Sequence, residues 1–230
     1  MRTLFMILTA GLLAVPQSAL AAIGCTLSNP AEDLKSLLPE MTSYKEDLKE
    51  FPHLKDGARL FKSLAARLGS DLDPIYETYE TPYTVYSVYK GKEKIGIVHG
   101  VNVPGKGGVI QVFLSTDPKT AAIRRFFFQR LESPAAAALR DKAFRAQFEG
   151  LTLADFYKHD YYAATEPGSA ADRVEKLALP KVDAAGRPDY EATIRGIHKD
   201  LILLDLFVYG RRFEPFFEKA QAAKAGKVKP

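Results

Sequence analysis

The chain has 230 residues, a formal net charge of +4 and a single cysteine. One cysteine excludes an intramolecular disulfide, so a hydrophobic core must hold the fold together. Acidic and basic residues are interspersed except in the basic tail KAQAAKAGKVKP, which is typical of a solvated segment, and the export expected from the first residues argues against a nucleic acid as the partner.

The first residues predict a secretory signal peptide. Arg2 precedes an uncharged and largely apolar stretch, Leu4–Val15, and the small-residue triplet Ala19-Leu20-Ala21 follows Pro16. A transmembrane helix needs about 20 apolar residues in succession, and this run ends sooner. We therefore expect residues 1–21 to be removed and the mature protein to be exported to the periplasm or anchored at the envelope.

The single cysteine, Cys25, follows the run Ala22-Ile23-Gly24, which resembles a bacterial lipobox. One interpretation makes Cys25 the lipidated first residue of a lipoprotein and residues 22–55 a tether and N-terminal segment. The other is plain cleavage after Ala21 or Ala22, which leaves Cys25 as an unmodified thiol. The sequence leaves both open.

Residues 56–210 carry the strongest structural signals. Apolar residues recur every three or four positions from 58 to 68 and Gly69 follows, which predicts an amphipathic helix. Two runs rich in β-branched and aromatic residues then flank Gly91-Lys92, which is typical of a hairpin. A second pair of strands is joined by a turn that begins at Asp117-Pro118. The predicted strands, which make a sequential antiparallel meander, are Tyr83–Tyr89, Lys94–Val101, Val109–Ser115 and Ala121–Gln129.

Helical patterns follow the predicted sheet. Short helices are expected after Pro134, a long surface loop over 165–188, and a C-terminal helix and basic tail over 211–230. Between these, one face of a helix collects the apolar residues Ile194, Ile197, Leu201, Leu204 and Val208, so this helix can lie across the sheet. The expected fold class is α+β, an antiparallel sheet with helices packed on it.

Four segments then occur in a familiar order and spacing: Gly107-Gly108, Asp117-Pro118, Glu132-Ser133-Pro134, and Phe144 with Gln147-Phe148-Glu149-Gly150. Over about residues 91–150 the chain resembles the FMN-binding domain of the RnfG and NqrC type, an exported module of membrane redox chains. The resemblance implies an FMN cofactor, a redox partner in the membrane, and an electron-transfer component rather than a stand-alone enzyme.

The resemblance also implies site residues. Gly107, Gly108, Glu132 and Ser133 would border the flavin. In the family, the threonine of a Ser-Gly-Ala-Thr motif is esterified to the FMN phosphate. Here Ala192-Thr193 has an upstream aspartate but lacks Ser-Gly, and a second Ala-Thr ends at Thr165 without a helix after it. Thr193 is therefore the implied phosphate-end residue, in the first turn of the predicted helix, and covalent attachment stays open.

Ordinary structural explanations stand beside these implications. Ser133 and Pro134 are typical of a helix start, with Ser133 as the N-cap, and glycines before a strand often form only a turn. The four histidines show no metal-ligand spacing, so no metal site is expected. A cofactor-free binding or scaffold domain that retains the fold is the alternative function.

Overall fold

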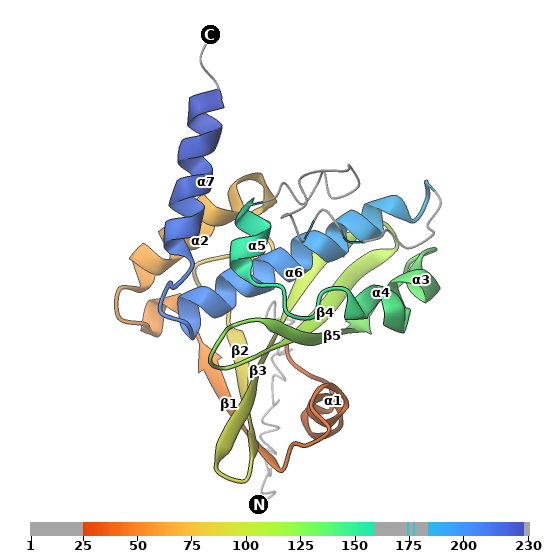
Figure 1. Cartoon of the computed structure of the whole chain (residues 1–230). Coiled ribbons are helices and arrows are strands. Elements are labelled where there is room, and N and C mark those ends of the chain that lie inside the picture. Colours follow the sequence, from red (N-terminus) through yellow and green to blue (C-terminus); the bar gives the residue numbers. More distant parts are fainter. Residues whose placement is uncertain (1–24, 159–173, 175–176, 178–183, 228–230) are drawn as a thin grey trace, which may run out of the picture.

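The computed structural model describes residues 25–158, 174, 177 and 184–227. In it a five-stranded antiparallel sheet has helices on both faces (Figure 1), which confirms the predicted α+β class. The strands lie side by side in chain order and are β1 (Ser43–Lys49), β2 (Tyr83–Lys90), β3 (Glu93–Gly105), β4 (Gly108–Thr116) and β5 (Ile123–Arg130). The helices are α1 (Pro30–Leu37), α2 (Gly57–Leu68), α3 (Ala136–Arg140), α4 (Lys142–Ala146), α5 (Leu153–Lys158), α6 (Arg187–Phe207) and α7 (Glu214–Lys227), with short 3-10 turns η1 (Phe51–His53) and η2 (Gly69–Asp71).

Strands β2 to β5 are the four predicted strands, joined by short turns. At the first hairpin, Gly91 has a φ of 58°, a left-handed conformation that glycine adopts without strain. At the turn before β5, the Asp117 carboxylate accepts hydrogen bonds from the backbone N–H groups of Lys119 and Thr120, as its Asp-Pro start favours.

Helix α6 covers one face of the sheet, against β3 and β4 (Figure 1). Its inner surface approaches the strands closely, because a Cβ at Gly196 would lie 3.1 Å from Val112 and 3.4 Å from Val103. The helix begins at Arg187, with Pro188 in its first turn, which is earlier than the pattern from Ile194 suggested. Most of its 21 residues are buried, and they join the main core with α2, α5 and the strands.

Helix α1 covers the opposite face and closes a second, smaller core. Leu34, Leu37 and Leu38 pack with Tyr86, Val88 and other strand residues there. The expectation that this N-terminal stretch is a tether is wrong from Cys25 onward, because α1 and β1 belong to the folded domain and Cys25 itself is buried in the smaller core. The predicted signal peptide lies outside the described residues.

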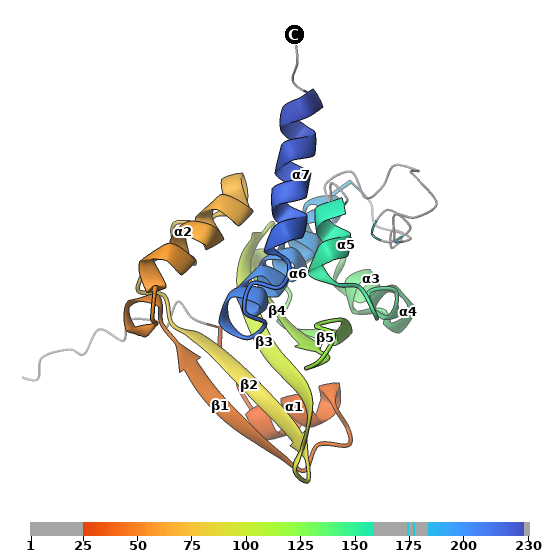
Figure 2. The same cartoon turned by 60° about the vertical axis from the view of Figure 1, so that its left-hand side comes forward.

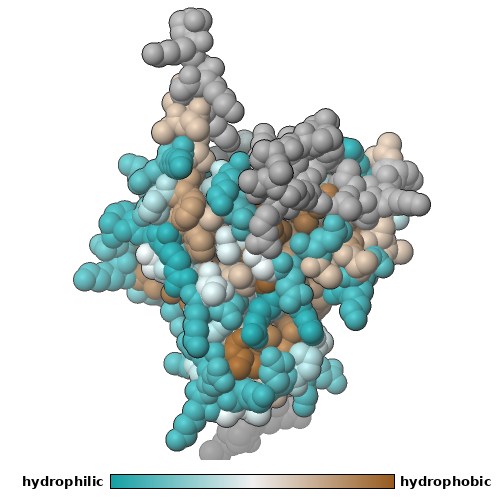
Figure 3. All heavy atoms as spheres, in the orientation of Figure 1, coloured by the Kyte–Doolittle hydropathy of each residue, from teal (hydrophilic) through white to brown (hydrophobic). Residues whose placement is uncertain are grey.

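Helix α7 projects from the body of the molecule (Figures 1 and 2). Its base is fixed by Phe213, which is buried in the main core, and by the ring of Phe217, 5.6 Å from that of Tyr157 on α5. In the space-filling view its apolar residues stand out against a mostly hydrophilic surface (Figure 3). Among the described helices, none combines the length and the apolar character needed to cross a bilayer.

Candidate functional site

The turn between β3 and β4 brings three of the sequence-predicted site residues together. A Cβ at Gly107 would lie 2.0 Å from the carbonyl oxygen of Glu132, so only glycine permits this approach. Gly108 has a φ of 137°, and a Cβ there would lie 3.7 Å from the Glu132 carboxylate. The glycine turn therefore lies directly against the segment that follows β5.

Glu132 and Ser133 are held by local interactions. The Glu132 carboxylate forms an ion pair of 3.0 Å with Arg130, and both side chains are more than half exposed. The Ser133 hydroxyl accepts a hydrogen bond of 3.0 Å from the backbone N–H of Ala135. The expectation that Ser133 is a helix N-cap is wrong, because α3 begins at Ala136 and its N-cap is Ala135.

Asp189, in the first turn of α6, holds the other side of the glycine turn. Its side chain is buried, and Oδ1 accepts a hydrogen bond of 2.6 Å from the backbone N–H of Lys106. A Cβ at Gly105 would lie 2.9 Å from the same oxygen. Asp189 Oδ2 is buried and has no hydrogen-bond partner among the described residues. The Asp189 carboxylate therefore holds the start of α6 against the glycine turn through Oδ1.

Thr193 lies one helical turn after Asp189. It is fully buried, and its hydroxyl donates a hydrogen bond of 2.8 Å to the Asp189 carbonyl oxygen. Because α6 begins at Arg187, the expectation that Thr193 is in the first helical turn is wrong, and its backbone N–H is not among the unpaired groups of the helix start. The competing residue, Thr165, lies outside the described residues.

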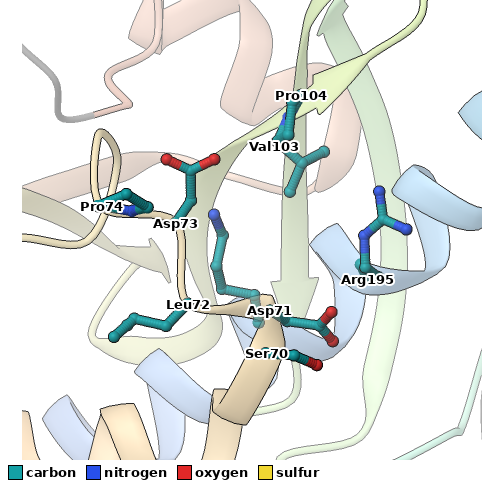
Figure 4. A pocket seen from close by; sticks show the side chains of 9 residues that line it. Ser70, Asp71, Leu72, Asp73, Pro74, Val103, Pro104 and Arg195 are labelled. Carbon is teal, nitrogen blue, oxygen red and sulfur yellow. The ribbon is translucent and has the colours of Figure 1, made fainter.

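A pocket of about 450 Å³ lies between α6, the end of β3 and the segment after α2 (Figure 4), and none of the sequence-predicted site residues lines it. Figure 4 shows Asp71 and Arg195 on different walls of the pocket, the first from η2 and the second from α6. Arg195 follows Thr193 by two residues, and Pro104 precedes the glycine turn. The residues that line it are Ser70, Asp71, Leu72, Asp73, Pro74, Val103, Pro104, Arg195 and Lys199.

Lys199 and Asp73 at the pocket are held in place by hydrogen bonds. The Lys199 ammonium donates hydrogen bonds to the Glu77 carboxylate at 2.6 Å and to the Asn102 carbonyl at 2.5 Å. Burial raises the pKa of Glu77 above its usual value, and the Lys199 charge opposes that rise. The Asp73 carboxylate accepts a hydrogen bond of 2.8 Å from the backbone N–H of Ile75, which caps the turn that carries Glu77. The wall at this side of the pocket is therefore preorganised.

Next to Lys199 in α6, Asp200 forms a buried pair with His99 of β3 that the sequence does not predict. His99 Nδ1 and Asp200 Oδ1 are 2.8 Å apart, and both side chains are completely buried. Desolvation raises the pKa of Asp200, and the neighbouring His99 opposes the rise. In the sequence, His198-Lys199-Asp200 interrupts the apolar pattern of α6, which indicates a buried polar site. Nothing in the sequence indicates that His99 is the partner of Asp200.

The described residues contain no group of three or more His, Cys, Asp or Glu side chains arranged to hold a metal ion. What the site offers is a preformed pocket within the usual size range of ligand sites, about 300–1,000 Å³. The charged groups of its lining are the carboxylates of Asp71 and Asp73, the Lys199 ammonium and the Arg195 guanidinium, a group of the kind that binds anions.

Comparisons with known proteins give likeness in structure only. No family model matches the chain, and no curated protein matches it. The crystal structure of NqrC from Shewanella oneidensis is similar in structure, with a TM-score of 0.45 and 14% sequence identity, over 86% of this chain and 90% of that one.

Proposed function

We propose that this protein is an exported FMN-binding module that passes electrons between a partner in the membrane and an acceptor outside the cytoplasm. The observation that carries the proposal is a convergence. Gly107 and Gly108 lie against Glu132, Asp189 binds the backbone of the same turn one helical turn before Thr193, and the chain continues from both sides of this cluster into the pocket wall at Pro104 and Arg195. FMN supplies the electron-accepting chemistry when bound, and the protein supplies position and electrostatics.

The proposed roles follow from what each residue can donate or accept. Arg195 binds the phosphate, because a guanidinium forms charge-assisted hydrogen bonds with phosphate oxygens. Asp189 is buried and does not line the pocket, so its role is to hold the start of α6 against the glycine turn. The glycine turn with Glu132 and Ser133 borders the ligand, and Thr193 supports the helix turn that links Asp189 to Arg195.

Noncovalent binding is the form that we propose. An ester at Thr193 would require its hydroxyl to leave the Asp189 carbonyl and come out of the core. Acid precipitation of the native protein followed by flavin fluorescence of the gel band distinguishes the two forms. Flavin that is released supports noncovalent binding; a fluorescent band lost in Thr193→Ala but kept in Thr165→Ala would establish the ester instead.

The binding experiment compares FMN with riboflavin, which lacks the phosphate. Titration of the purified protein, followed by quenching of flavin fluorescence, should show FMN binding more tightly than riboflavin. Arg195→Ala should weaken FMN binding by roughly ten- to a hundredfold and leave riboflavin binding nearly unchanged. Arg59→Ala is the matched control, since Arg59 is exposed on α2 and pairs with Asp56 away from the pocket.

The second candidate, a cofactor-free binding or scaffold domain, is favoured by one observation. Thr193 and the backbone N–H of Lys106 already have partners within the protein, so no ligand is needed to hold the glycine turn against α6. Protein purified from its native host that is colourless, and that binds neither FMN nor riboflavin, would establish this candidate and reject the flavin proposal.

Export and membrane association belong to the same proposal. The predicted signal peptide supports export, and the family resemblance is the ground for proposing a membrane redox partner. The buried position of Cys25 favours plain cleavage over lipidation, because an acylated cysteine must leave the smaller core.

A further inference from the structure

Strand β1 is the outermost strand of the sheet and pairs with β2 alone among the described strands. In Figure 2 no other described element lies along its outer edge. Six of its seven residues are exposed, and they include both faces of the strand. An edge strand of this kind presents unpaired N–H and C=O groups to which another strand can add.

The sequence of β1, SYKEDLK, is complementary to itself when it is read in the antiparallel direction. We propose that β1 pairs with β1 of a second copy of this chain, about a two-fold axis that passes through Glu46. This register places Ser43 opposite Lys49, Tyr44 opposite Leu48 and Lys45 opposite Asp47 of the second copy. Because of the symmetry each of these pairs occurs twice.

Charge selects this register over its neighbours. An axis at Lys45 would set that lysine against its own copy. An axis at Asp47 would set two aspartates against each other and Lys45 against Lys49. Opposite charges directly across two strands stabilise the pairing and like charges weaken it. Only the axis at Glu46 forms two Lys45–Asp47 pairs, at the cost of one Glu46–Glu46 contact on the axis.

The apolar residues fit the same register. Tyr44 and Leu48 are 38% and 57% exposed, although both are large and hydrophobic. They lie on the face of the sheet that carries α1, opposite Val88 and Thr84 of β2. In the proposed dimer each Tyr44 covers the Leu48 of the second copy, so the smaller core continues across the interface.

Charge reversal tests the proposal on the full chain with the N-terminus that it carries in the cell. Sedimentation equilibrium across a wide range of concentrations should show a monomer–dimer equilibrium for the unchanged protein. Lys45→Asp places acidic side chains opposite Asp47, and Asp47→Lys places basic side chains opposite Lys45. Each variant alone should dimerise at least about tenfold more weakly. An equimolar mixture of the two variants should form a heterodimer, because opposite charges again face each other.

Glu46→Gln is the complementary variant, because it removes the like charges on the axis and should tighten the dimer. Circular dichroism of each variant establishes that it is folded, and formation of the heterodimer establishes it independently. A chain that stays monomeric at every concentration would overturn the proposal. So would a dimer whose dissociation constant is the same in all three variants, since its interface would then lie elsewhere.

Discussion

Gly107 lies so close to the Glu132 backbone that a substitution there tests the geometry of the glycine turn. A methyl group there would meet the Glu132 carbonyl at 2.0 Å, so Gly107→Ala must push the β3–β4 turn away from the segment after β5. We expect a loss of about 1–3 kcal/mol in the free energy of unfolding, as for other overpacked positions. Urea unfolding measures it, with Lys106→Ala as the neighbouring exposed control. Equal stability of the two variants would show that the turn is free to move.

Asp200 predicts a pH dependence of stability. Burial raises its pKa in the folded protein, so between the unfolded pKa, about 4, and the higher folded pKa the native state binds more protons than the unfolded chain. The free energy of unfolding should therefore fall as the pH rises through this window. Asp200→Asn should reduce that fall without abolishing it, because burial also raises the pKa of Glu77 and of Asp205.

Urea unfolding at a series of pH values above about 4 measures the effect of Asp200. The conservative change keeps an acceptor facing His99, and Glu93→Gln, at an exposed position of the first hairpin, serves as the control. If Asp200→Asn and the control give the same slope of stability against pH, Asp200 is not the group responsible.

Among the elements, α7 combines a fixed base with a projecting end. The ring of Phe217 contacts Tyr157, whereas the residues from Gln221 onward are exposed wherever their side chains are described. Deletion of residues 221–230 should change the free energy of unfolding by no more than about 0.5 kcal/mol. Phe217→Ala should cost clearly more, because it removes an aromatic contact between α5 and α7. Thermal unfolding of both variants checks this, and a large loss on deletion would contradict it.

Of the helices and strands, those with a clear apolar pattern could be predicted from the sequence. Strands β2 to β5 were predicted because their β-branched and aromatic runs are separated by strong turn residues. Strand β1 was missed because SYKEDLK is exposed on both faces and therefore has no alternation of apolar and polar residues. Helix α6 was predicted from its apolar face, but its start was misplaced because the polar first turn, which contains Asp189, packs against the glycine turn rather than against the core pattern.

The candidate site was predictable only in part. The glycine turn and Glu132 carry local signals that a sequence motif can capture. The pocket walls and the pairs Lys199–Glu77 and His99–Asp200 join residues about a hundred positions apart or more, and such contacts exist only once the sheet and α6 are assembled. Ser133 shows that a local signal can also mislead. Serine is a favourable N-cap, but α3 begins three residues later, at Ala136.

At the scale of the whole molecule, Cys25 reports on both the N-terminus and the folding state. Burial and the nearby Asp200 raise the pKa of its thiol, and the thiolate is the reactive form. A thiol reagent should therefore label the native protein slowly and the protein in urea rapidly, as measured by mass spectrometry. A lipidated chain would show no free thiol in either condition and a diacylglyceryl group on Cys25, which would contradict plain cleavage.

The position of α6 in the chain sets the order in which this protein can become stable. Strands β1 to β5 are complete at Arg130, but the helix that covers one face of β3 and β4 ends only at Phe207. Until α6 has been synthesised, a growing chain carries a sheet whose α6-facing side is apolar and lacks that cover. We therefore expect a chain truncated before Arg187 to be a target for proteases rather than a smaller working domain.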